Sequence, residues 1–581
     1  MIFRSFYLLG VALAAASAAL LDEFVNAEPA FIDYKMLPEF DLEGEGKGRT
    51  AGLSWTAKCV NLTSQAWMSE ADWGADWGGA NAHWWHYMFI ITPSEIKSDS
   101  KDWRTLYITN GKNSDPVPGK NNENIGGTAE LAMTTGQVFV TLLQVPNVPI
   151  YLKTPDGTQT RAFGDDDLLA NTFVHYMDYI KAGGTNAIED KDSLGAASWV
   201  VILPMVKAGF AAMAAAESIL GDTAPAKWAV TGASKRGWTA WLVGAVDMAR
   251  DASNKRVQGI APIVLDGVHF EKTLKLHYEA YGGWSFAMRA FLDAGFTGRI
   301  DSEEIKPLWE LIDPYYYMTR YKGLPKLVCN ALGDEWFLPD DSRYWYNEMK
   351  EFGPLSLVMV PDAEHSMATG LPSLIPTIGS FVSNLAANRE SPHFTWEIDY
   401  GHDEKDASIV VTIDSAFVDM PRTVQMWHSA TCHKDTLRRD FRLVNLDAKT
   451  MGDCPCGPKL SDTQCFNLHS GIWANSTLTA DASDSTGATY IAQQKVPSRA
   501  LERWEGFFVT VTFHGAAPDS AATGNNTPAD GGDGCMQRLG DRRVCVPVVS
   551  VGDMMLASQV VIVPDYRPHQ CYGEQCTGTL L

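Results

Sequence analysis

Short apolar runs alternate with segments of helical periodicity through the middle of the chain, from residue 102 to residue 392. The runs are apolar at consecutive positions, which is typical of strands buried on both faces of a parallel sheet. They cover residues 105–109, 138–145, 228–232, 260–266, 326–332 and 355–361. The segments between them, such as 206–220 and 373–389, repeat apolar residues at helical spacing. This alternation predicts an α/β fold with a mostly parallel sheet and helices on both faces.

Two further regions depart from this alternation. A long helical insert rich in aromatic residues lies between Asp266 and Tyr321, and we expect it to cap the carboxyl edge of the sheet. Beyond residue 390, apolar and polar positions alternate with period two and turn residues separate the runs. That pattern predicts a β-sandwich-like domain. The expected organisation is an α/β domain over residues 19–390 and a β-rich domain over residues 391–581.

The first residues have the layout of a secretory signal peptide. Arg4 precedes an apolar run that starts at Phe6 and ends in the small residues Ala16-Ser17-Ala18. The alternative is an N-terminal membrane anchor, but the run is short, rich in alanine and ends like a cleavage site. No later stretch gives 18 uninterrupted apolar residues. We therefore predict a signal peptide at residues 1–18 and a secreted protein without membrane insertion.

Cysteine usage agrees with secretion, because eight of the ten cysteines fall in the last 150 residues. An even, clustered set in a secreted chain predicts disulfides, although eight cysteines allow 105 pairings. The cysteines of this set are Cys432, Cys454, Cys456, Cys465, Cys535, Cys545, Cys571 and Cys576. Cys329 lies inside an apolar run and is expected to be a buried free thiol. Asn61, Asn475 and Asn525 begin N-x-S/T sequences, so we expect glycans there.

Charge and ligand patterns exclude several classes of function. The net charge of −23 argues against nucleic acid or an anionic membrane as a partner, since both require a basic surface. His83 and His86 lie three residues apart beside two tryptophans, and no further ligands complete a metal site. We expect these histidines to pack, and we predict no metal and no cofactor.

Residues 228–237, WAVTGASKRG, raise the question of catalysis. A strand that turns sharply into a helix through a serine is how α/β-hydrolases present a nucleophile. The usual signature is G-x-S-x-G, whereas here Arg236 occupies the position of the second glycine. A serine at a helix start is also the ordinary N-cap residue. Ser234 is therefore a candidate nucleophile with capping as its alternative role.

A catalytic serine requires a histidine base and an acid that orients it. In α/β-hydrolases the acid and the histidine follow the nucleophile, each after a strand. Asp334 follows the run 326–332, and His365 follows the run 355–361. Asp266, after the run 260–266, is a rival for the acid, and Asp340 and Asp341 are weaker rivals. We prefer Asp334 because its G-D-x-x-x-x-P context shapes a loop that turns the carboxylate toward the sheet edge.

Other residues complete the predicted site. The N–H groups of Lys235 and of Gly111, the latter in the loop after residues 105–109, are expected to form the oxyanion hole. Arg236 could bind a substrate carboxylate or form a structural salt bridge beneath the turn. Trp336, next to the acid, could form an apolar wall, and Asn147 is expected to line the same edge. The acidic triplet at residues 165–167 is expected to be a solvated turn.

Several long motifs resemble the PhoPQ-activated pathogenicity-related protein family, among them GASKRGWTAWL, GDEWFLPDDSRYW, VPDAEHS and LLQVPNVP. The resemblance covers about residues 30–515 and includes FTWEID and PRTVQMWHSA in the β-rich part. It implies an α/β-hydrolase fold with Ser234, Asp334 and His365 at the triad positions. The family itself carries S-K-R-G at the turn, so Arg236 follows its pattern. Some members are described as signalling proteins.

Two functions follow as hypotheses. The first is a secreted serine hydrolase, either an esterase or a peptidase, that uses Ser234, His365 and Asp334 on a small ester or peptide substrate. The second is an extracellular signalling or binding protein that keeps the hydrolase scaffold and acts through a cell-surface receptor, because a fold does not fix a function.

Overall fold

The computed structural model describes most of the chain between residues 19 and 571. The longer described stretches are 19–67, 83–153, 160–185, 196–401, 406–432, 438–445, 472–495, 503–518 and 547–571. Shorter described pieces are 454, 457, 459, 461, 465–466, 537–539, 542–544, 576, 578 and 580. The predicted signal peptide at residues 1–18 and the predicted glycan site at Asn525 lie outside the described residues.

The chain folds into two compact units. The first comprises Met1–Pro262, His269–Glu271 and Ala290–Pro325, and the second comprises Ile263–Val268, Lys272–Arg289 and Lys326–Leu581. This division does not follow the boundary near residue 390, which stays a prediction. The helical insert contributes to both units, and its longer elements are α6 (Phe270–Tyr281), α7 (Arg289–Asp293), α8 (Lys306–Ile312) and η11 (Pro314–Tyr321).

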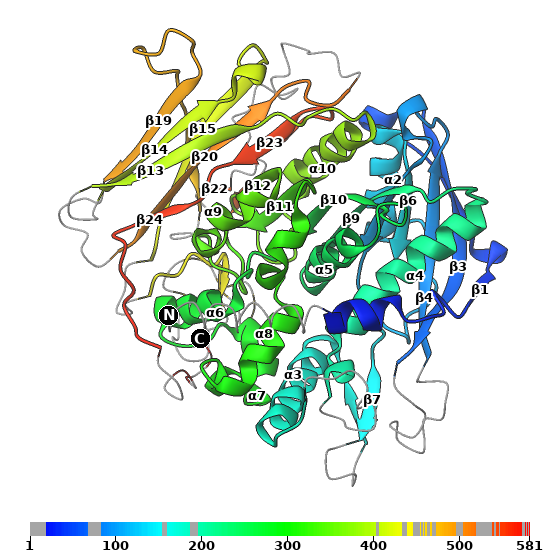
Figure 1. The fold of residues 1–581 in the computed structure, drawn as a ribbon. Coiled ribbons are helices and arrows are strands. Elements are labelled where there is room, and N and C mark those ends of the chain that lie inside the picture. The colour runs from blue at the N-terminus through cyan, green and yellow to red at the C-terminus, as the bar shows by residue number, and fades with distance from the viewer. Residues whose placement is uncertain are drawn as a thin grey trace. The chain divides into compact units, whose positions relative to one another are not determined.

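In the first unit, a mixed sheet runs in the order β1-β3-β4-β6-β5-β9-β10, with β2 paired to β3 (Figure 1). The strands are β1 (Asp33–Met36), β2 (Leu42–Glu45), β3 (Ser54–Ala66), β4 (His83–Pro93), β5 (Trp103–Ile108), β6 (Val138–Leu142), β9 (Lys227–Ala233) and β10 (Val257–Ile263). The pairs β1–β3, β3–β4 and β4–β6 are antiparallel, whereas β6–β5 and β5–β9 are parallel. The continuous apolar runs become these buried parallel strands.

Helices of the first unit cover its sheet. The connection from β5 to β6 passes through α2 (Glu123–Thr135), and α4 (Ile202–Leu220) precedes β9 on the other side of β5. Because parallel crossovers are right-handed, connections that run in opposite directions from β5 put α2 and α4 on opposite faces. Helix α4 is long and apolar enough to cross a membrane, but 78% of its apolar stretch is buried inside the protein, as in a core helix.

In the second unit, β11 (Lys326–Ala331) and β12 (Leu355–Val360) are parallel. An antiparallel series continues from β12 through β23 (Met554–Ala557), β20 (Glu505–Phe513), β15 (Arg422–Ala430) and β18 (Ala474–Thr477). A separate antiparallel sheet contains β13 (Phe394–Tyr400), β14 (Asp406–Ile413) and β19 (Thr489–Lys495), and it contacts β20 and β24 (Val561–Val563). Two stacked antiparallel sheets agree with the predicted sandwich, and together with the parallel strands they confirm the predicted α/β-hydrolase fold class with a β-rich C-terminal part.

Disulfides lie in the C-terminal part, as predicted. Cys454 pairs with Cys465, and Cys571 pairs with Cys576. Cys432 is also disulfide-bonded. Among the described residues, the free cysteines are Cys59 and Cys329, both buried. The prediction of a buried free thiol at Cys329 is therefore confirmed.

Candidate active site

The turn between β9 and α5 (Lys235–Ala249) consists of one residue, Ser234. Its backbone has φ 61° and ψ −130°, a conformation that residues with a side chain rarely adopt. Gly232 makes the turn possible, since a Cβ there would lie 2.7 Å from the Arg236 carbonyl oxygen. Strand and helix thus approach too closely for a side chain at Gly232. This is the shape of the strained strand-to-helix turn that exposes a nucleophile.

Capping, the alternative role of Ser234, is not what the side chain does. Ser234 occupies the N-cap position of α5, yet its hydroxyl makes no capping hydrogen bond. A residue that caps a helix normally has extended backbone torsions and accepts a bond from the second or third helical N–H. Ser234 has neither feature. The strain at this residue is therefore not explained by helix stability.

The residues after Ser234 are anchored by acidic side chains, a contact that the sequence did not indicate. Lys235 Nζ lies 3.0 Å from Asp165 Oδ2 and 2.6 Å from Asp166 Oδ1. Arg236 Nη2 donates to both oxygens of Asp165, at 2.9 and 3.0 Å. Burial tends to raise the pKa of Asp165, but the charges of Arg236 and Lys235 outweigh it and hold that pKa below its usual range.

The acidic triplet is not a solvated turn, so that expectation was wrong. Residues 165–167 form the first turn of α3 (Asp165–Lys181), where carboxylates interact favourably with the helix dipole. The contacts of Asp165 with Lys235 and Arg236 span 70 and 71 positions of sequence, which no local pattern reveals. Asp165 is therefore a structural support of the turn that sequence reasoning missed.

Of the two roles considered for Arg236, the contacts match the structural one. Its guanidinium is buried, bonds to Asp165, and donates through Nε to the carbonyl of Val145, beyond the end of β6. Asn147 is likewise engaged within the protein. Its amide donates to the Trp85 carbonyl, and its Oδ1 accepts from Asn113 Nδ2 at 3.1 Å. These side chains join the loops around the turn.

The proposed oxyanion donors lie in the first unit with Ser234. Lys235 is the first residue of α5, and the N–H groups of a first helical turn have no partner within the helix. Gly111 follows β5 at φ 145°, and a Cβ there would lie 3.1 Å from Gln144 Cγ. Its loop contacts the loop after β6, since Gln144 N donates to Asn110 O at 3.2 Å. The oxyanion role of both N–H groups stays a prediction.

The second unit holds the predicted acid and base as a hydrogen-bonded pair. His365 Nδ1 lies 2.8 Å from Asp334 Oδ2 and 2.9 Å from Oδ1. A carboxylate only accepts hydrogen bonds, so Nδ1 of His365 is the donor in this pair. The side chain of Asp334 is 1% exposed and that of His365 is 18% exposed. This difference in exposure suits the two predicted roles, because the orienting acid is buried while the base is accessible.

Neighbouring groups fix both members of the pair. Asp334 Oδ1 accepts the N–H groups of Trp336 at 2.6 Å and Phe337 at 3.2 Å. The N–H of His365 donates to Glu335 Oε2 at 3.0 Å. Burial, with a further contribution from the charge of Asp334, raises the pKa of Glu335 to about 7. Glu335 is a second support that the sequence analysis did not single out.

Aromatic rings lie beside the histidine. The ring centroids of Trp336 and Phe337 are 6.0 and 6.1 Å from that of His365. The expected apolar wall at Trp336 stays a prediction, and the ring lies beside the histidine. Its contact with a substrate stays a prediction.

Asp266, the rival acid, lies in a different environment. It is buried, its Oδ1 has no hydrogen-bond partner, and burial raises its pKa well above the usual value. The charges of Asp334 and Asp340 act in the same direction. Burial thus disfavours the charged carboxylate, which is the form that would stabilise an imidazolium. The geometry therefore favours Asp334 over Asp266.

An Asp–His pair alone does not define a catalytic site, because the second unit contains another. His514 Nδ1 lies 2.8 Å from Asp553 Oδ2, and its Nε2 lies 3.0 Å from Thr423 Oγ1. Thr423 is part of β15 and pairs with Thr512 in a regular ladder, rather than standing on a strained turn. The strained backbone of Ser234 therefore has no counterpart at Thr423.

Of the two histidines considered as metal ligands, His86 is buried and His83 is exposed, so the expectation that both pack was wrong for His83. His86 is fully buried, with Nε2 2.9 Å from Ser64 Oγ and Nδ1 3.0 Å from the Leu143 carbonyl. Burial lowers its pKa to about 4. Both ring nitrogens of His86 thus have hydrogen-bond partners within the protein, as expected for a packed histidine. Within the described ranges, no group of three or more His, Cys, Asp or Glu side chains could hold a metal ion.

Comparison with known proteins identifies relatives of the chain. The model of the PhoPQ-activated pathogenicity-related protein family matches residues 38–442. Autocrine proliferation repressor protein A of Dictyostelium discoideum is 29% identical over 498 residues, which cover 85% of each chain.

Solved structures with similar folds include esterases and a lipase. An acetyl xylan esterase from a Paenibacillus species has a TM-score of 0.34 and 14% identity, covering 60% of this chain and 87% of its own. Acetyl xylan esterase 1 from a Thermoanaerobacterium species has a TM-score of 0.33 and 15% identity, covering 63% and 93%. Lipase A of Candida antarctica has a TM-score of 0.31 and 10% identity, covering 62% and 83%.

Proposed function

Because this chain belongs to the PhoPQ-activated pathogenicity-related protein family, we propose that its hydrolase scaffold is catalytically active and that Ser234 is the nucleophile of a secreted esterase or peptidase. His365 is the proposed base and Asp334 the proposed orienting acid. Ser234 belongs to the first compact unit, and the other two residues belong to the second. The proposal therefore requires both units for activity.

One observation carries the proposal: Ser234 has φ 61° while its hydroxyl caps nothing. Strained torsions at residues other than glycine cost on the order of 1–3 kcal/mol and persist where the surroundings impose them. Here the close strand-to-helix approach at Gly232 and the ion pairs of Lys235 and Arg236 impose it. A strained serine that does not serve stability is best explained by chemistry at its hydroxyl.

The chemistry follows from the proton positions. In the proposed reaction, Ser234 Oγ attacks the carbonyl carbon of an ester or amide while His365 Nε2 takes its proton. The N–H groups of Lys235 and Gly111 stabilise the negative oxygen of the tetrahedral intermediate. His365 then donates the proton to the leaving alcohol or amine, which produces an acyl-enzyme. Water repeats the sequence and releases the acid.

We also propose that the protein acts outside the cell. Its C-terminal disulfides are typical of extracellular proteins. A signal peptide at residues 1–18 would direct the chain to that compartment, where Asn61, Asn475 and Asn525 would be accessible to glycosylation. The net charge of −23 supports small neutral or cationic substrates rather than polyanions.

Labelling with a fluorophosphonate probe tests the proposal, since such probes react only with an activated serine. We expect the purified secreted protein to be labelled, Ser234→Ala to be unlabelled, and the exposed-serine control Ser415→Ala to be labelled like the wild type. A wild-type protein that is folded and yet unlabelled would contradict the hydrolase proposal.

The similarity to a proliferation repressor favours a second candidate function. In this alternative the chain is an extracellular signal with little or no catalysis, recognised by a cell-surface receptor. Growth of cells treated with the wild type or with Ser234→Ala distinguishes the two. Equal effects of both proteins on growth would support the signal, and loss of the effect in Ser234→Ala would support the hydrolase.

A further inference from the structure

A helix of the second unit supports the loop that carries the acid. Residues Leu276, Ala280 and Tyr281 of α6 form a buried cluster with Leu338, and Tyr344 packs against it. We call residues 332–341 the acid loop, because Asp334 begins its turn and Leu338 anchors its far side. The position of Asp334 thus depends on a helix that is remote from it in sequence.

His277 of α6 contacts this loop through a defined pair of hydrogen bonds. Its Nε2 lies 3.0 Å from the N–H of Ser285, and its Nδ1 lies 3.2 Å from the carbonyl oxygen of Trp336. A backbone N–H can only donate and a carbonyl can only accept, so Nδ1 carries the proton. Burial lowers the pKa of His277 to about 3, which keeps the ring neutral in this tautomer.

The peptide backbone of Trp336 connects His277 with the acid. The carbonyl of Trp336 accepts from His277, while its N–H donates to Asp334 Oδ1 at 2.6 Å. The indole ring of the same residue lies beside the ring of His365. His277 therefore holds the residue that fixes both the carboxylate and one side of the base.

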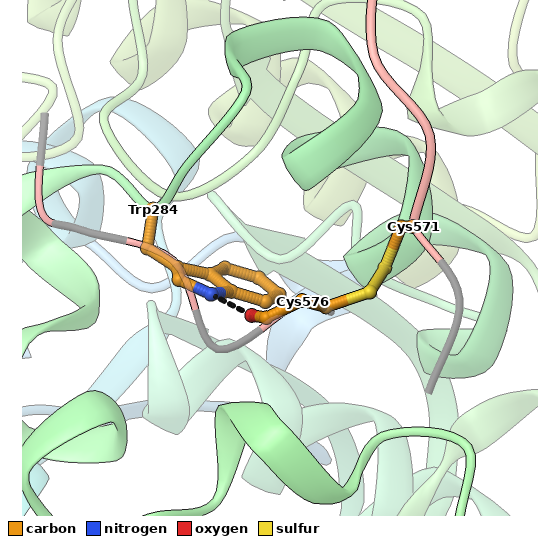
Figure 2. Close-up of a disulfide and its surroundings, with 3 residues drawn as sticks. All are labelled: Trp284, Cys571 and Cys576. Atoms are coloured by element: carbon orange, nitrogen blue, oxygen red, sulfur yellow. Dashed lines mark hydrogen bonds between the residues drawn. A yellow bond between two sulfur atoms is a disulfide. The ribbon is translucent and has the colours of Figure 1, made fainter. Parts of the chain in front are cut away.

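The end of the chain in turn packs on the segment that follows His277. Trp284 stacks on the His277 ring at 5.5 Å between centroids. Figure 2 shows the indole N–H of Trp284 pointing at the carbonyl of Cys576, to which it donates at 2.6 Å, beside the disulfide to Cys571. The N–H of His569 donates to Glu279 O at 3.1 Å, so the chain also contacts α6 just before the disulfide.

We propose that His277 is a positioning residue for the proposed hydrolase reaction, and that the Cys571–Cys576 disulfide keeps it in place through Trp284. This inference rests on the proposed function. His277 supports the orienting acid through backbone hydrogen bonds, and the Cys571–Cys576 disulfide fixes the end of the chain covalently. Reduction of the Cys571–Cys576 disulfide would therefore lower activity without changing the reacting groups.

Two substitutions separate positioning from packing. His277→Phe keeps a ring for Trp284 to stack on and removes both hydrogen bonds. His277→Asn keeps an amide N–H near the position of Nδ1. With an ester substrate, we expect kcat of His277→Phe to fall about 10- to 100-fold, as misplacement of catalytic groups does, with KM unchanged. His277→Asn should recover most of the loss.

The disulfide has a matched control. We expect the double variant Cys571→Ser/Cys576→Ser to lose kcat as His277→Phe does, with KM unchanged. The variant Cys454→Ser/Cys465→Ser also lacks one C-terminal disulfide and should keep normal kcat. Equal losses in both double variants, or none in the first, would overturn the role of the Cys571–Cys576 bond.

A readout independent of turnover separates this inference from the proposed function. In the full-length protein, the proton between His365 Nδ1 and Asp334 is expected to give a low-field NMR resonance. The His514–Asp553 pair provides an internal reference. The resonance of His365 should shift or broaden in His277→Phe and return in His277→Asn. A wild-type protein that the fluorophosphonate probe does not label would refute the hydrolase proposal but not the hydrogen-bonded support by His277. An unchanged His365 resonance and an unchanged kcat in His277→Phe would refute the positioning role.

Discussion

Single residues in this protein take their roles from their surroundings more than from their chemical type. Asp334 and Asp266 are both aspartates that follow apolar runs. The first accepts two backbone N–H groups and contacts His365, so its charge is compensated. The second has a buried oxygen without a partner and a pKa raised by burial. Only the first is suited to stabilise an imidazolium.

Substitution of each aspartate by asparagine tests this distinction. In Asp334→Asn the amide oxygen can keep the N–H bonds of Trp336 and Phe337, but an NH₂ group faces His365 and imposes the wrong tautomer. We expect turnover to fall about 10⁴-fold with a nearly normal melting temperature. Asp266→Asn replaces a carboxyl group whose pKa is raised by burial with a neutral amide and should keep turnover. Ester-hydrolysis kinetics and thermal melts measure both, and the reverse pattern would transfer the role to Asp266.

Glu335 predicts a pH dependence of stability. Burial raises its pKa from 4.5 to about 7, so its contribution to the free energy of unfolding is fully present below pH 4.5 and is lost as pH rises through 7. Glu335→Gln keeps an oxygen for the His365 N–H and does not titrate. We expect the stability of the wild type relative to Glu335→Gln to decline across this window in urea unfolding. A constant difference between the two proteins would contradict the prediction.

At the scale of elements, the important junction is the turn from β9 into α5. Three separate features shape it: the missing side chain of Gly232, the strained Ser234, and the first turn of α3, whose Asp165 pairs with Lys235 and Arg236. The buried cations would be costly without that acid, because an unpaired buried charge is strongly destabilising. The turn is therefore held from its strand side and from a second helix.

Two glycine substitutions test the close approach at this junction. Gly232→Ala places a Cβ 2.7 Å from a backbone oxygen that cannot yield easily. We expect a loss of about 1–3 kcal/mol in stability together with weaker fluorophosphonate labelling. Gly126→Ala, in α2 with open space around the Cβ, should instead stabilise by about 0.5–1 kcal/mol. Denaturant unfolding compares the two, and a stabilising Gly232→Ala would show that the turn tolerates a side chain.

For the whole molecule, the described cysteines divide into two free thiols and a disulfide-bonded group in the C-terminal part. Cys59 and Cys329 are buried free thiols on β3 and β11. Burial, followed by the charges of Asp41 and Glu39, raises the pKa of Cys59 to about 12, and burial also raises the pKa of Cys329. Neither thiol is exposed or ionised enough to react in the native protein.

Alkylation followed by mass spectrometry checks this arrangement. We expect no cysteine of the native, non-reduced protein to react with iodoacetamide, because the free thiols are buried and protonated. After denaturation without reductant, Cys59 and Cys329 should react. More than two free thiols beyond residue 430 would overturn the prediction that most of the C-terminal cysteines are oxidised.

The sequence anticipated the fold better than the support of the site. The apolar runs correctly located β5, β6, β9, β10, β11 and β12, because burial on both faces leaves a continuous local signal. The sequence placed residues 165–167 in a solvated turn. An acidic triplet looks the same in such a turn as it does at the start of a helix where it pairs with buried cationic side chains. It gave no indication of His277, since a histidine in an amphipathic helix looks the same whether or not its nitrogens are used.

The sequence by itself determined the family and the order of strands and helices, and it predicted three side chains as nucleophile, base and acid. These follow from local periodicity, glycine placement and motif order, which neighbouring residues encode. Only the tertiary structure decided that His365 contacts Asp334, that Ser234 has strained torsions without capping, and that Asp165 and His277 support the loops. Those facts depend on which distant groups meet and how far water is excluded, and neither quantity is present in any local stretch of sequence.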